Sequence, residues 1–542
     1  MLKWVFYLFN IPALFVNCID FVFYRFTQKR ATGDLFTSEV AGDIKNNLFN
    51  YISDFWYVLL ILIILVFLME FMYRKIKIDS GKQPSGFIIS ALYIFIFIGL
   101  FIIGARGGLQ YKPITMQAAA RYAPPRLIPL VLNTPFTIIK TWDMQGLSAA
   151  KYFPDEKAEL LFSIRKNNQP YLPMKKLNVI IIIMESFSRE YIGFFNTGHG
   201  YTPFLDSLCR KSFVFSNAFA NGKRSIEGIP AVTAGLPALM DEAFITSAYN
   251  TNRINSIAGL LHAKGYVTSF FHGGNNGSMG FDNFSSLAGY NKFYGRNEYT
   301  GPAADYDGSW GIYDQPFFKF FKNEIDKMPL PFCTTIFSIS SHHPYAIPTI
   351  YKNKFPKGKQ PIHESVGYAD FALQTFFNAA STSSWFNNTL FVITADHTGP
   401  AYETYYQTTK GIFEIPIIFY CPSDTSLKGI SGRITQQADI FPSILDYLNY
   451  SGSYSAFGTS AFKEKDNFAV NYNNNLYQYF NQDYLLQFDG DSTVGFYQYH
   501  RDSFLLKNLA GRNIEAQHDL ELKTKAVIQQ YHQSMIHNSL VK

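Results

Sequence analysis

The sequence predicts an α/β protein in which amino-terminal transmembrane helices precede a mostly parallel sheet flanked by helices, followed by a small carboxy-terminal subdomain. Three observations predict this fold class. Long apolar runs near the amino terminus are typical of membrane spans. Short apolar runs farther along are continuous rather than alternating, which indicates strands buried on both faces. The intervals between these short runs leave room for crossover helices.

Three segments are predicted to cross a membrane. Residues 55–73 and 87–104 are almost uninterrupted apolar runs, and helices of about 27 Å made from them would span a bilayer with little tilt. The segment 4–24 lacks a small-residue cleavage site, so we expect an uncleaved span there rather than an interfacial or signal-like helix. Four residues interrupt this segment: Asn10, Pro12, Asn17 and Asp20. Residues 1–104 are therefore the predicted transmembrane region.

Charges around the spans predict the orientation of the chain. The loop between the second and third spans is basic, with Arg74, Lys75, Lys77 and Lys82 against one acid, Asp79. By the positive-inside rule this loop is cytoplasmic, so everything after Gly104 is expected outside the cytoplasm. Three basic residues after the first span oppose this assignment: Arg25, Lys29 and Arg30. Three acidic residues that follow partly offset them: Asp34, Glu39 and Asp43.

Composition narrows the possible partners. The 542 residues are enough for two or three structural units. The net charge of +6 is mild and no basic run indicates nucleic acid, so we expect no nucleic-acid partner and some attraction to anionic lipid headgroups. The few cysteines are widely separated and predict neither a disulfide framework nor a zinc knuckle: Cys18, Cys209, Cys333 and Cys421.

Beyond the spans the sequence divides into three further parts. Residues 105–177 contain many Pro and Arg residues and are predicted to be a partly helical juxtamembrane connector that lies along the membrane surface. Residues 178–465 are predicted to be a soluble domain with helices at 251–264 and 364–380. Its predicted strands are NVIIIIM (178–184), YVTSFFHG (266–273), FCTTIFSIS (332–340), TLFVITA (389–395) and IPIIFY (415–420). Residues 466–542 are predicted to be the carboxy-terminal subdomain, with strand-like pieces such as SFLLKNL and a polar helix near 515–535.

Polar side chains follow several of the predicted strands. Because the carboxyl ends of parallel strands meet at one edge of a sheet, these side chains are expected to gather there: Glu185, His272, His342, His343, Asp396 and His397. Glu185, Asp396 and His397 make a mixed oxygen and nitrogen set that suits manganese, zinc or a similar cation. The alternative for Glu185 is a carboxylate that complements the dipole of a helix start.

Ser225 is a candidate nucleophile. It follows Asn-Gly-Lys-Arg and opens a predicted helix, where backbone amides favour an anion and where a metal could lower the pKa of the hydroxyl. Lys223 and Arg224 beside it add positive charge suited to a phosphate. The alternative is that Ser225 is an ordinary helix cap.

An ordered set of motifs resembles the lipoteichoic-acid-synthase-like, sulfatase-like membrane enzymes of the alkaline phosphatase superfamily. The motifs are NVIIIIMES, NGKRSIEGIPA, FFHGGN, ISSHHPY, YADFALQTFF, ITADHTG and the DIFPSILDYL element at 439–448. The resemblance covers roughly residues 1–465 and implies a sulfatase-like catalytic domain at 178–465 with an alkaline-phosphatase-like sheet. It also implies a multi-pass protein of the bacterial cell (inner) membrane with an extracytoplasmic or periplasmic catalytic domain.

The resemblance also implies roles for the candidate residues. One divalent ion, expected to be Mn²⁺ with Zn²⁺ or Mg²⁺ as alternatives, would be held by Glu185, Ser225, Asp396 and His397. Ser225 would form a covalent phospho-enzyme intermediate at a position that the family usually fills with threonine. His342, two residues before Pro344, matches the family histidine that contacts the transferred phosphate, and the remaining expected substrate-binding residues are Lys223, Arg224 and His272.

Two departures from the family pattern are visible. The tryptophan and arginine with which lipoteichoic acid synthases bind glycerol phosphate align with Met279 and Phe281 here, and Trp310 is not expected to replace that tryptophan because it falls in the next element. Family members usually have five spans, whereas three are predicted here, so the chain is either truncated at its start or a shorter variant.

The leading functional hypothesis is an enzyme that moves an alcohol phosphate, preferentially phosphoglycerol, from a membrane phospholipid to an extracytoplasmic glycan or lipid. A phosphoethanolamine transferase shares the architecture but usually carries several periplasmic disulfides. A sulfatase-like phosphodiesterase or hydrolase is a further alternative, although a true sulfatase needs a maturation motif that Lys223 to Ile229 does not fit. The alternative from a different class is a non-catalytic membrane binding protein that retains the fold.

Overall fold

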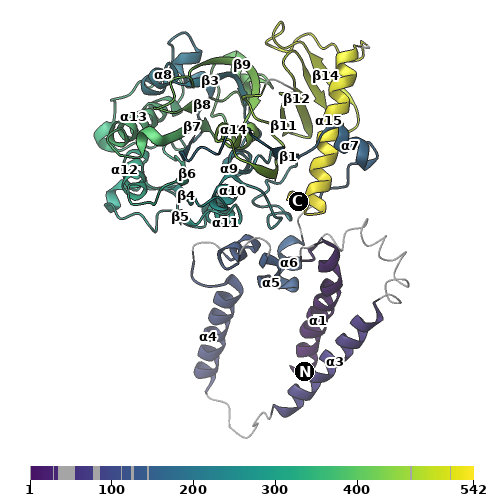
Figure 1. Cartoon of the computed structure of the whole chain (residues 1–542). Helices are drawn as coiled ribbons and strands as arrows, with labels where there is room; N and C mark the ends of the chain where they lie inside the picture. The colour runs from purple at the N-terminus through teal and green to yellow at the C-terminus, as the bar shows by residue number, and fades with distance from the viewer. Residues whose placement is uncertain are drawn as a thin grey trace. The chain divides into compact units, whose positions relative to one another are not determined.

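The computed structural model forms two compact units (Figure 1). One comprises Met1–Gly146 with Asn250–Asn252, and the other comprises Leu147–Tyr249 with Arg253–Lys542. The residues that the structure describes are 2–27, 30–33, 55–76, 86–110, 113–123, 127–142, 146–463, 467–512 and 514–541.

Within the described residues, three helices are long and apolar enough to cross a membrane, as predicted, and all three belong to the first unit. They are α1 (Leu2–Thr27), α3 (Trp56–Lys75) and α4 (Phe87–Arg106). The Glu70 carboxylate of α3 accepts hydrogen bonds from Lys3 at 3.0 Å and from Arg74 at 2.6 Å, which places the start of α1 beside the end of α3. Most of the loop charges used to predict the orientation lie outside the described residues: Lys29, Asp34, Glu39, Asp43, Lys77, Asp79 and Lys82.

Short helices follow α4 in the first unit: η2 (Met116–Arg121), α5 (Ile128–Val131) and α6 (Thr134–Thr141). A buried carboxylate, Asp20 of α1, joins α6 and the segment around Arg30 to the first span. It accepts hydrogen bonds from the Arg30 guanidinium at 2.6 Å, from the Ala31 amide at 2.6 Å and from the Thr134 hydroxyl at 3.0 Å. A charge at a buried position needs partners of this kind.

The residues after Gly146 pack within the second unit, although the sequence predicts a connector as far as residue 177. Helix α7 (Asp155–Leu161) packs against α15 (Glu515–Ile536), and strand β1 (Arg165–Asn168) pairs with β10 (Gly452–Ser455). These contacts join segments far apart in the sequence, which is why no local pattern marks this boundary.

The second unit is built on an eight-stranded sheet with the order β5-β4-β6-β2-β7-β8-β3-β9. The strands are β2 (Asn178–Met184), β3 (Phe213–Phe219), β4 (Val267–His272), β5 (Lys292–Tyr294), β6 (Phe332–Phe337), β7 (Thr389–Ala395), β8 (Ile417–Tyr420) and β9 (Gly429–Gln436). Among these described strands only β8 runs antiparallel to its neighbours, so the prediction of a mostly parallel sheet is confirmed.

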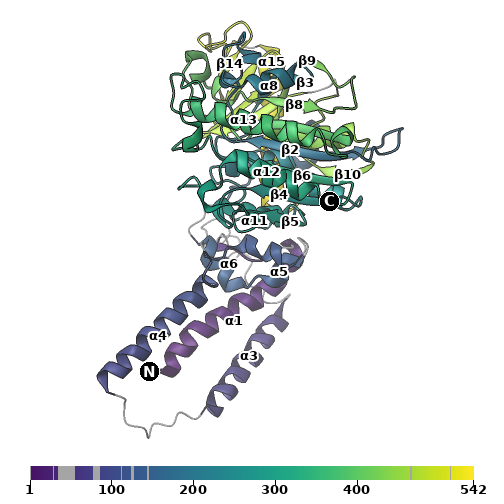
Figure 2. The same ribbon diagram turned by 90° about the vertical axis from the view of Figure 1, so that its left-hand side faces the viewer.

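Helices cover both faces of this sheet (Figures 1 and 2). One set packs together as α8 (Pro203–Cys209), α12 (Asp314–Ile325) and α13 (Ile362–Ala380), and the other as α9 (Ser225–Ala234), α10 (Ile257–His262) and α14 (Ile440–Tyr447). A further short helix, α11 (Phe281–Leu287), precedes β5. The helix predicted at 251–264 is shorter than expected because the Ser256 hydroxyl accepts the Gly259 amide at 3.0 Å and starts α10 there.

A four-stranded antiparallel sheet and α15 form the carboxy-terminal part. Its strands are β11 (Ala469–Asn473), β12 (Leu476–Phe480), β13 (Leu485–Phe488) and β14 (Thr493–Tyr497). The prediction of a strand at SFLLKNL was wrong. The Asp502 carboxylate accepts the Leu506 amide at 3.0 Å and the Lys507 amide at 2.7 Å, which closes a turn instead.

Asp370 of α13 is a buried carboxylate that caps α8 by accepting the Phe204 and Leu205 amides, both at 2.9 Å. Burial raises its pKa to about 7. Because the folded protein holds this proton more tightly than the unfolded chain, the stability it contributes is present below about pH 4 and is lost as the pH rises toward 7.

We therefore expect Asp370→Asn to flatten the fall in unfolding free energy over that pH window by about 1–4 kcal/mol, at about 1.4 kcal/mol per pKa unit. Urea denaturation of the detergent-solubilised protein, followed by tryptophan fluorescence at several pH values, measures this slope. Asp326→Asn is the control because the pKa of Asp326 is lowered by its hydrogen bonds to Lys322, Trp385 and Ser383, which act against the effect of burial. An unchanged slope in Asp370→Asn would contradict the prediction.

Candidate functional site

Glu185, Asp396 and His397 meet at one edge of the sheet. Glu185 follows β2, and Asp396 and His397 follow β7, the neighbouring parallel strand. Met184 pairs with Ala395 across these strands, so the register makes the next two residues neighbours. One ligand atom from each of the three side chains lies within 4.8 Å of the others.

The His397 imidazole faces both carboxylates. Its Nε2 lies 3.7 Å from Glu185 Oε1 and 3.2 Å from Asp396 Oδ2. Its Nδ1 lies 2.9 Å from the carbonyl oxygen of Thr398, and a carbonyl can only accept, so Nδ1 carries the proton. The lone pair of Nε2 is then free to bind a cation between the carboxylates.

The hydrogen bonds of the Asp396 carboxylate show whether a cation would fit at this site. Its Oδ1 accepts the Ser186 and His397 amides, both at 2.8 Å. Its Oδ2 is buried, and no donor among the described residues reaches it. A buried carboxylate oxygen without a partner is costly, and a divalent cation at this position would satisfy it.

Both the backbone and the side chain of Glu185 form hydrogen bonds with serine hydroxyls. Its amide donates to the Ser338 hydroxyl at 2.8 Å, its carbonyl accepts from the Ser341 hydroxyl at 2.5 Å, and its Oε1 accepts from the Ser186 hydroxyl at 2.6 Å. Burial, and then the negative charge of Asp396, raise the pKa of Glu185 well above its usual value. Two carboxylates so close together in a buried site therefore suit a divalent cation, which would remove their repulsion.

Ser225 joins this group from the start of α9. It is buried, and its hydroxyl donates to Glu185 Oε2 at 3.3 Å, while the cap position of the helix is Arg224. Helix α9 can lie this close to the Asp396 backbone only because residue 228 is glycine, since a Cβ atom there would lie 2.1 Å from the carbonyl oxygen of Asp396. The structure thus brings together three oxygen donors and one nitrogen donor, which is the ligand set that the family resemblance implies.

The two basic residues before Ser225 have different surroundings. Lys223 Nζ donates to the Thr398 hydroxyl at 2.5 Å and to the Ile412 carbonyl at 2.9 Å, and burial lowers its pKa to about 8. The half-exposed Arg224 guanidinium is paired with Glu227 at 2.6 Å and donates to the Asp241 carbonyl at 2.9 Å. Lys223 therefore contacts the loop that carries His397, whereas Arg224 is bound to the first turn of its own helix.

His272 lies in an aromatic environment. Its ring stacks on Phe337 with centroids 4.7 Å apart and meets the edge of Phe281 at 5.3 Å. Burial lowers the pKa of His272 to about 4, so the ring is neutral near pH 7. Phe281, which aligns with the family arginine, is fully buried and supports His272.

Trp310 lies against His342, a contact that the sequence did not predict. The two ring centroids are 4.1 Å apart, and Trp310 Nε1 donates to the His343 carbonyl at 2.6 Å. The same carbonyl lies 2.9 Å from His342 Nδ1. The one signal in the sequence is the turn before Trp310, where the Asp307 carboxylate accepts three successive amides, those of Ser309, Trp310 and Gly311.

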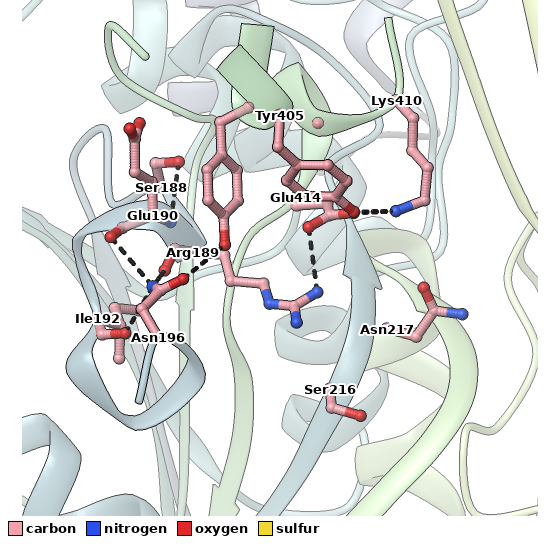
Figure 3. A network of polar contacts seen from close by, with 12 residues as sticks. Ser188, Arg189, Glu190, Ile192, Asn196, Ser216, Asn217, Tyr405, Lys410 and Glu414 are labelled. Carbon is pink, nitrogen blue, oxygen red and sulfur yellow. Dashed lines mark hydrogen bonds and ion pairs between the residues drawn. The ribbon is translucent and has the colours of Figure 1, made fainter. Parts of the chain in front are cut away.

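A buried ionic network links the loop after Glu185 to the segment that contacts Lys223 (Figure 3). The Glu414 carboxylate is buried and accepts from Arg189 at 3.0 Å and from the Tyr405 hydroxyl at 2.6 Å, and it is also paired with Lys410. This network was missed because Lys410 and Glu414 belong to no motif.

Comparisons with known proteins agree with this geometry. Lipoteichoic acid synthase 2 of Bacillus subtilis (strain 168) is 26% identical over 244 residues, which are 43% of this chain and 37% of that protein. Phosphoglycerol transferase I of Escherichia fergusonii is 28% identical over 244 residues, 42% of this chain and 31% of that protein. The chain thus spans only about a third of the length of these two curated relatives.

A solved structure and a family model complete the comparison. A protein of the alkaline phosphatase superfamily from Vibrio parahaemolyticus has the same fold, with a TM-score of 0.65 and 23% identity over 72% of this chain and 98% of its own. The Sulfatase family model matches residues 177–450, about half of the chain. The resemblance predicted from the motifs is confirmed, and the protein belongs to the sulfatase family.

Proposed function

We propose that this protein is a membrane-anchored, metal-dependent transferase that moves an alcohol phosphate, with phosphoglycerol as the favoured group, from a membrane phospholipid to an extracytoplasmic glycan or lipid. The observation that carries the proposal is the buried Ser225 hydroxyl beside Glu185, at a cluster completed by Asp396 and His397. The relatives named lipoteichoic acid synthase and phosphoglycerol transferase support the choice of phosphoglycerol.

The proposed cofactor is one divalent ion, Mn²⁺ in preference to Zn²⁺ or Mg²⁺, held by Glu185, Asp396, His397 and Ser225. When bound, such an ion would lower the pKa of the serine hydroxyl and neutralise charge on the phosphate. The unpartnered Oδ2 of Asp396 and the repulsion between the two carboxylates support it.

Ser225 is the proposed nucleophile. Its Oγ forms a bond to the phosphorus of the donor lipid as the bond from phosphorus to the glyceride oxygen breaks, and the diacylglycerol leaves with the hydroxyl proton. A hydroxyl of the acceptor then attacks phosphorus, the bond to Oγ breaks, and the acceptor proton returns to Ser225. Positioning and charge neutralisation supply most of the rate in reactions of this type.

The proposed partners of the phosphate are His342 and Lys223. Lys223 contributes positive charge at the loop that carries His397, and its contact with Thr398 supports this role. The contact of the His342 ring with the Trp310 ring supports a fixed position for His342. His272 would act as a neutral group, and Arg224 is already neutralised by Glu227.

The proposed orientation places the catalytic domain outside the cytoplasm. Arg74 and Lys75 end α3, and the contact of Lys3 with Glu70 puts the start of α1 beside them. With these cations on the cytoplasmic side, α4 runs outward and ends at Arg106.

Ser225→Ala is expected to abolish the covalent intermediate and to lower transfer at least on the order of 10³-fold, because no other nucleophile is proposed for the site. The purified full-length protein with Mn²⁺ would be incubated with labelled phosphatidylglycerol and, separately, with phosphatidylethanolamine, followed by mass spectrometry of the Ser225 peptide. Ser216→Ala is the control, because Ser216 lies in β3 and donates to the Ser431 carbonyl.

A phosphoglycerol adduct that Ser225→Ala removes supports the proposal. A phosphoethanolamine adduct would instead identify a phosphoethanolamine transferase, and release of free glycerol phosphate without transfer would identify a hydrolase. The absence of any adduct from a protein with bound metal would contradict the proposed intermediate and favour a binding protein.

Metal affinity is expected to rise with pH, because the pKa of Glu185 is raised and a metal must displace its proton. One displaced proton corresponds to about a tenfold gain in affinity per pH unit below that pKa. Calorimetry in buffers of different ionisation enthalpy counts the protons released. Glu185→Gln should weaken binding and remove this slope, whereas Glu190→Gln should keep it, since Glu190 accepts the Tyr402 and Glu403 amides away from the cluster. Equal slopes in both variants would refute the assignment.

Trp310→Ala is expected to lower kcat/KM for the donor lipid about tenfold without changing metal affinity, because it frees the His342 ring and the His343 carbonyl. Trp310→Phe, which keeps a ring but not the N–H group, should lose less. Steady-state kinetics with metal titration measure both quantities, and Trp142→Ala, in the first unit, is the control. Loss of metal affinity in Trp310→Ala would show that Trp310 supports the metal centre instead.

A further inference from the structure

Gln437 holds the backbone at the point where the metal ligands leave β7. It lies in η12 (Gln437–Asp439), between β9 and α14, and is fully buried. Its Nε2 donates to the carbonyl oxygens of Ala395 and Asp396, both at 2.7 Å. The two hydrogens of one amide thus bind two successive carbonyls, and this fixes the two peptide planes that determine where the Asp396 carboxylate points.

The other atom of the same amide reaches the segment that carries the proposed nucleophile. Gln437 Oε1 accepts the backbone amide of Asn221 at 2.8 Å. The Asn221 side chain returns the contact, since its Oδ1 accepts the amide of Ala438 at 2.8 Å. Gln437 therefore connects the segment before Ser225 to the segment that carries Asp396, without contacting either functional side chain.

The buried amide network continues into the carboxy-terminal sheet. Asn221 Nδ2 donates to Gln436 Oε1 at 2.7 Å and to the carbonyl oxygen of Val470 at 2.6 Å. Gln436 Oε1 also accepts the amide of Val470 at 2.9 Å. Val470 belongs to β11, the first strand of the small sheet, so a strand with no polar residue at the metal centre contacts the segment that leads to Ser225.

Packing leaves little freedom between these segments. Gly228 of α9 lies so close to Asp396 that a Cβ atom would be 2.1 Å from the Asp396 carbonyl oxygen, the oxygen that Gln437 binds from another direction. One close backbone contact and one amide thus act on the position of Asp396 relative to Ser225, beside the contact of Lys223 with Thr398. A glycine contact limits only how near the two segments come, whereas the amide prevents them from separating.

We propose that Gln437 is a positioning residue that sets the separation of Ser225 and Asp396 for the metal ion, and that Asn221 extends this function to β11. The inference rests on the metal centre of the proposed function. Only an amide meets the requirement, because the site needs two donated hydrogens and one acceptor on a single side chain. A glutamate in this position keeps the acceptor for Asn221 and loses both donors.

The test compares metal binding and folding in the purified full-length protein. Gln437→Glu is expected to weaken Mn²⁺ binding about 10- to 100-fold by calorimetry, the range for residues that orient metal ligands. The melting temperature of the metal-free protein is measured beside it, since a purely structural role would lower that temperature without a specific loss of affinity. The control is Gln482→Glu, because Gln482 also bridges two backbone groups, the Gly432 carbonyl and the Ile434 amide, but outside the metal centre.

A second variant keeps the test decisive if Gln437→Glu fails to fold. Asn221→Asp retains the acceptor for Ala438 and loses the donors to Gln436 and Val470, so a smaller loss of affinity is expected. In the Ser225→Ala background, Gln437→Glu should reduce Mn²⁺ affinity by a smaller factor. The serine ligand, whose distance from Asp396 Gln437 is proposed to set, is then absent.

The outcomes separate this inference from the proposed function. Wild-type protein that binds no divalent metal would overturn the metal centre itself. Wild-type protein that binds Mn²⁺, with folded Gln437→Glu and Asn221→Asp variants that bind it equally well, would overturn only the positioning role. A loss confined to these variants and absent from Gln482→Glu supports that role.

Discussion

Two buried carboxylates that face each other at neighbouring strand ends are the constraint on which the rest of the structure depends. Glu185 and Asp396 directly follow the paired residues Met184 and Ala395 of β2 and β7, and burial together with the negative charge of Asp396 raises the pKa of Glu185. Such an arrangement is unfavourable unless something holds it together. The surrounding hydrogen bonds to backbone atoms and serine hydroxyls hold the two residues in place.

Around this pair of carboxylates, backbone contacts and side-chain contacts have different roles. The parallel sheet places Glu185 and Asp396 at neighbouring strand ends. The close contact of Gly228 in α9 with the Asp396 backbone lets Ser225 lie beside them. Neutral amides such as Gln437 join the segments without adding charge to a site that already has two carboxylates. In the Arg189, Glu414 and Lys410 network (Figure 3), the cations pair with a carboxylate that is not part of the cluster.

Much of the fold and the ligand cluster could be predicted because the signals are local. The predicted strands 178–184 and 389–395 coincide with β2 and β7, since their Ile, Val and Leu residues are buried on both faces, and a polar residue directly after such a run is easy to recognise. Gln437 and Trp310 could not be predicted in the same way. Their partners are backbone carbonyls 41 and 33 residues away, and even the turn before Trp310 does not identify the carbonyl that it contacts. The antiparallel direction of β8 is likewise invisible in an apolar run.

The hydrogen bond from Asn221 to the Val470 carbonyl joins segments that are synthesised at different times. Val470 comes after every ligand of the cluster in the chain, the last of which is His397. A growing polypeptide that already contains Glu185, Ser225, Asp396 and His397 still lacks the strand that completes the amide network. In the positioning role proposed for Gln437 and Asn221, the metal centre would therefore be completed only after the small carboxy-terminal sheet has been made and has packed against the segment before Ser225.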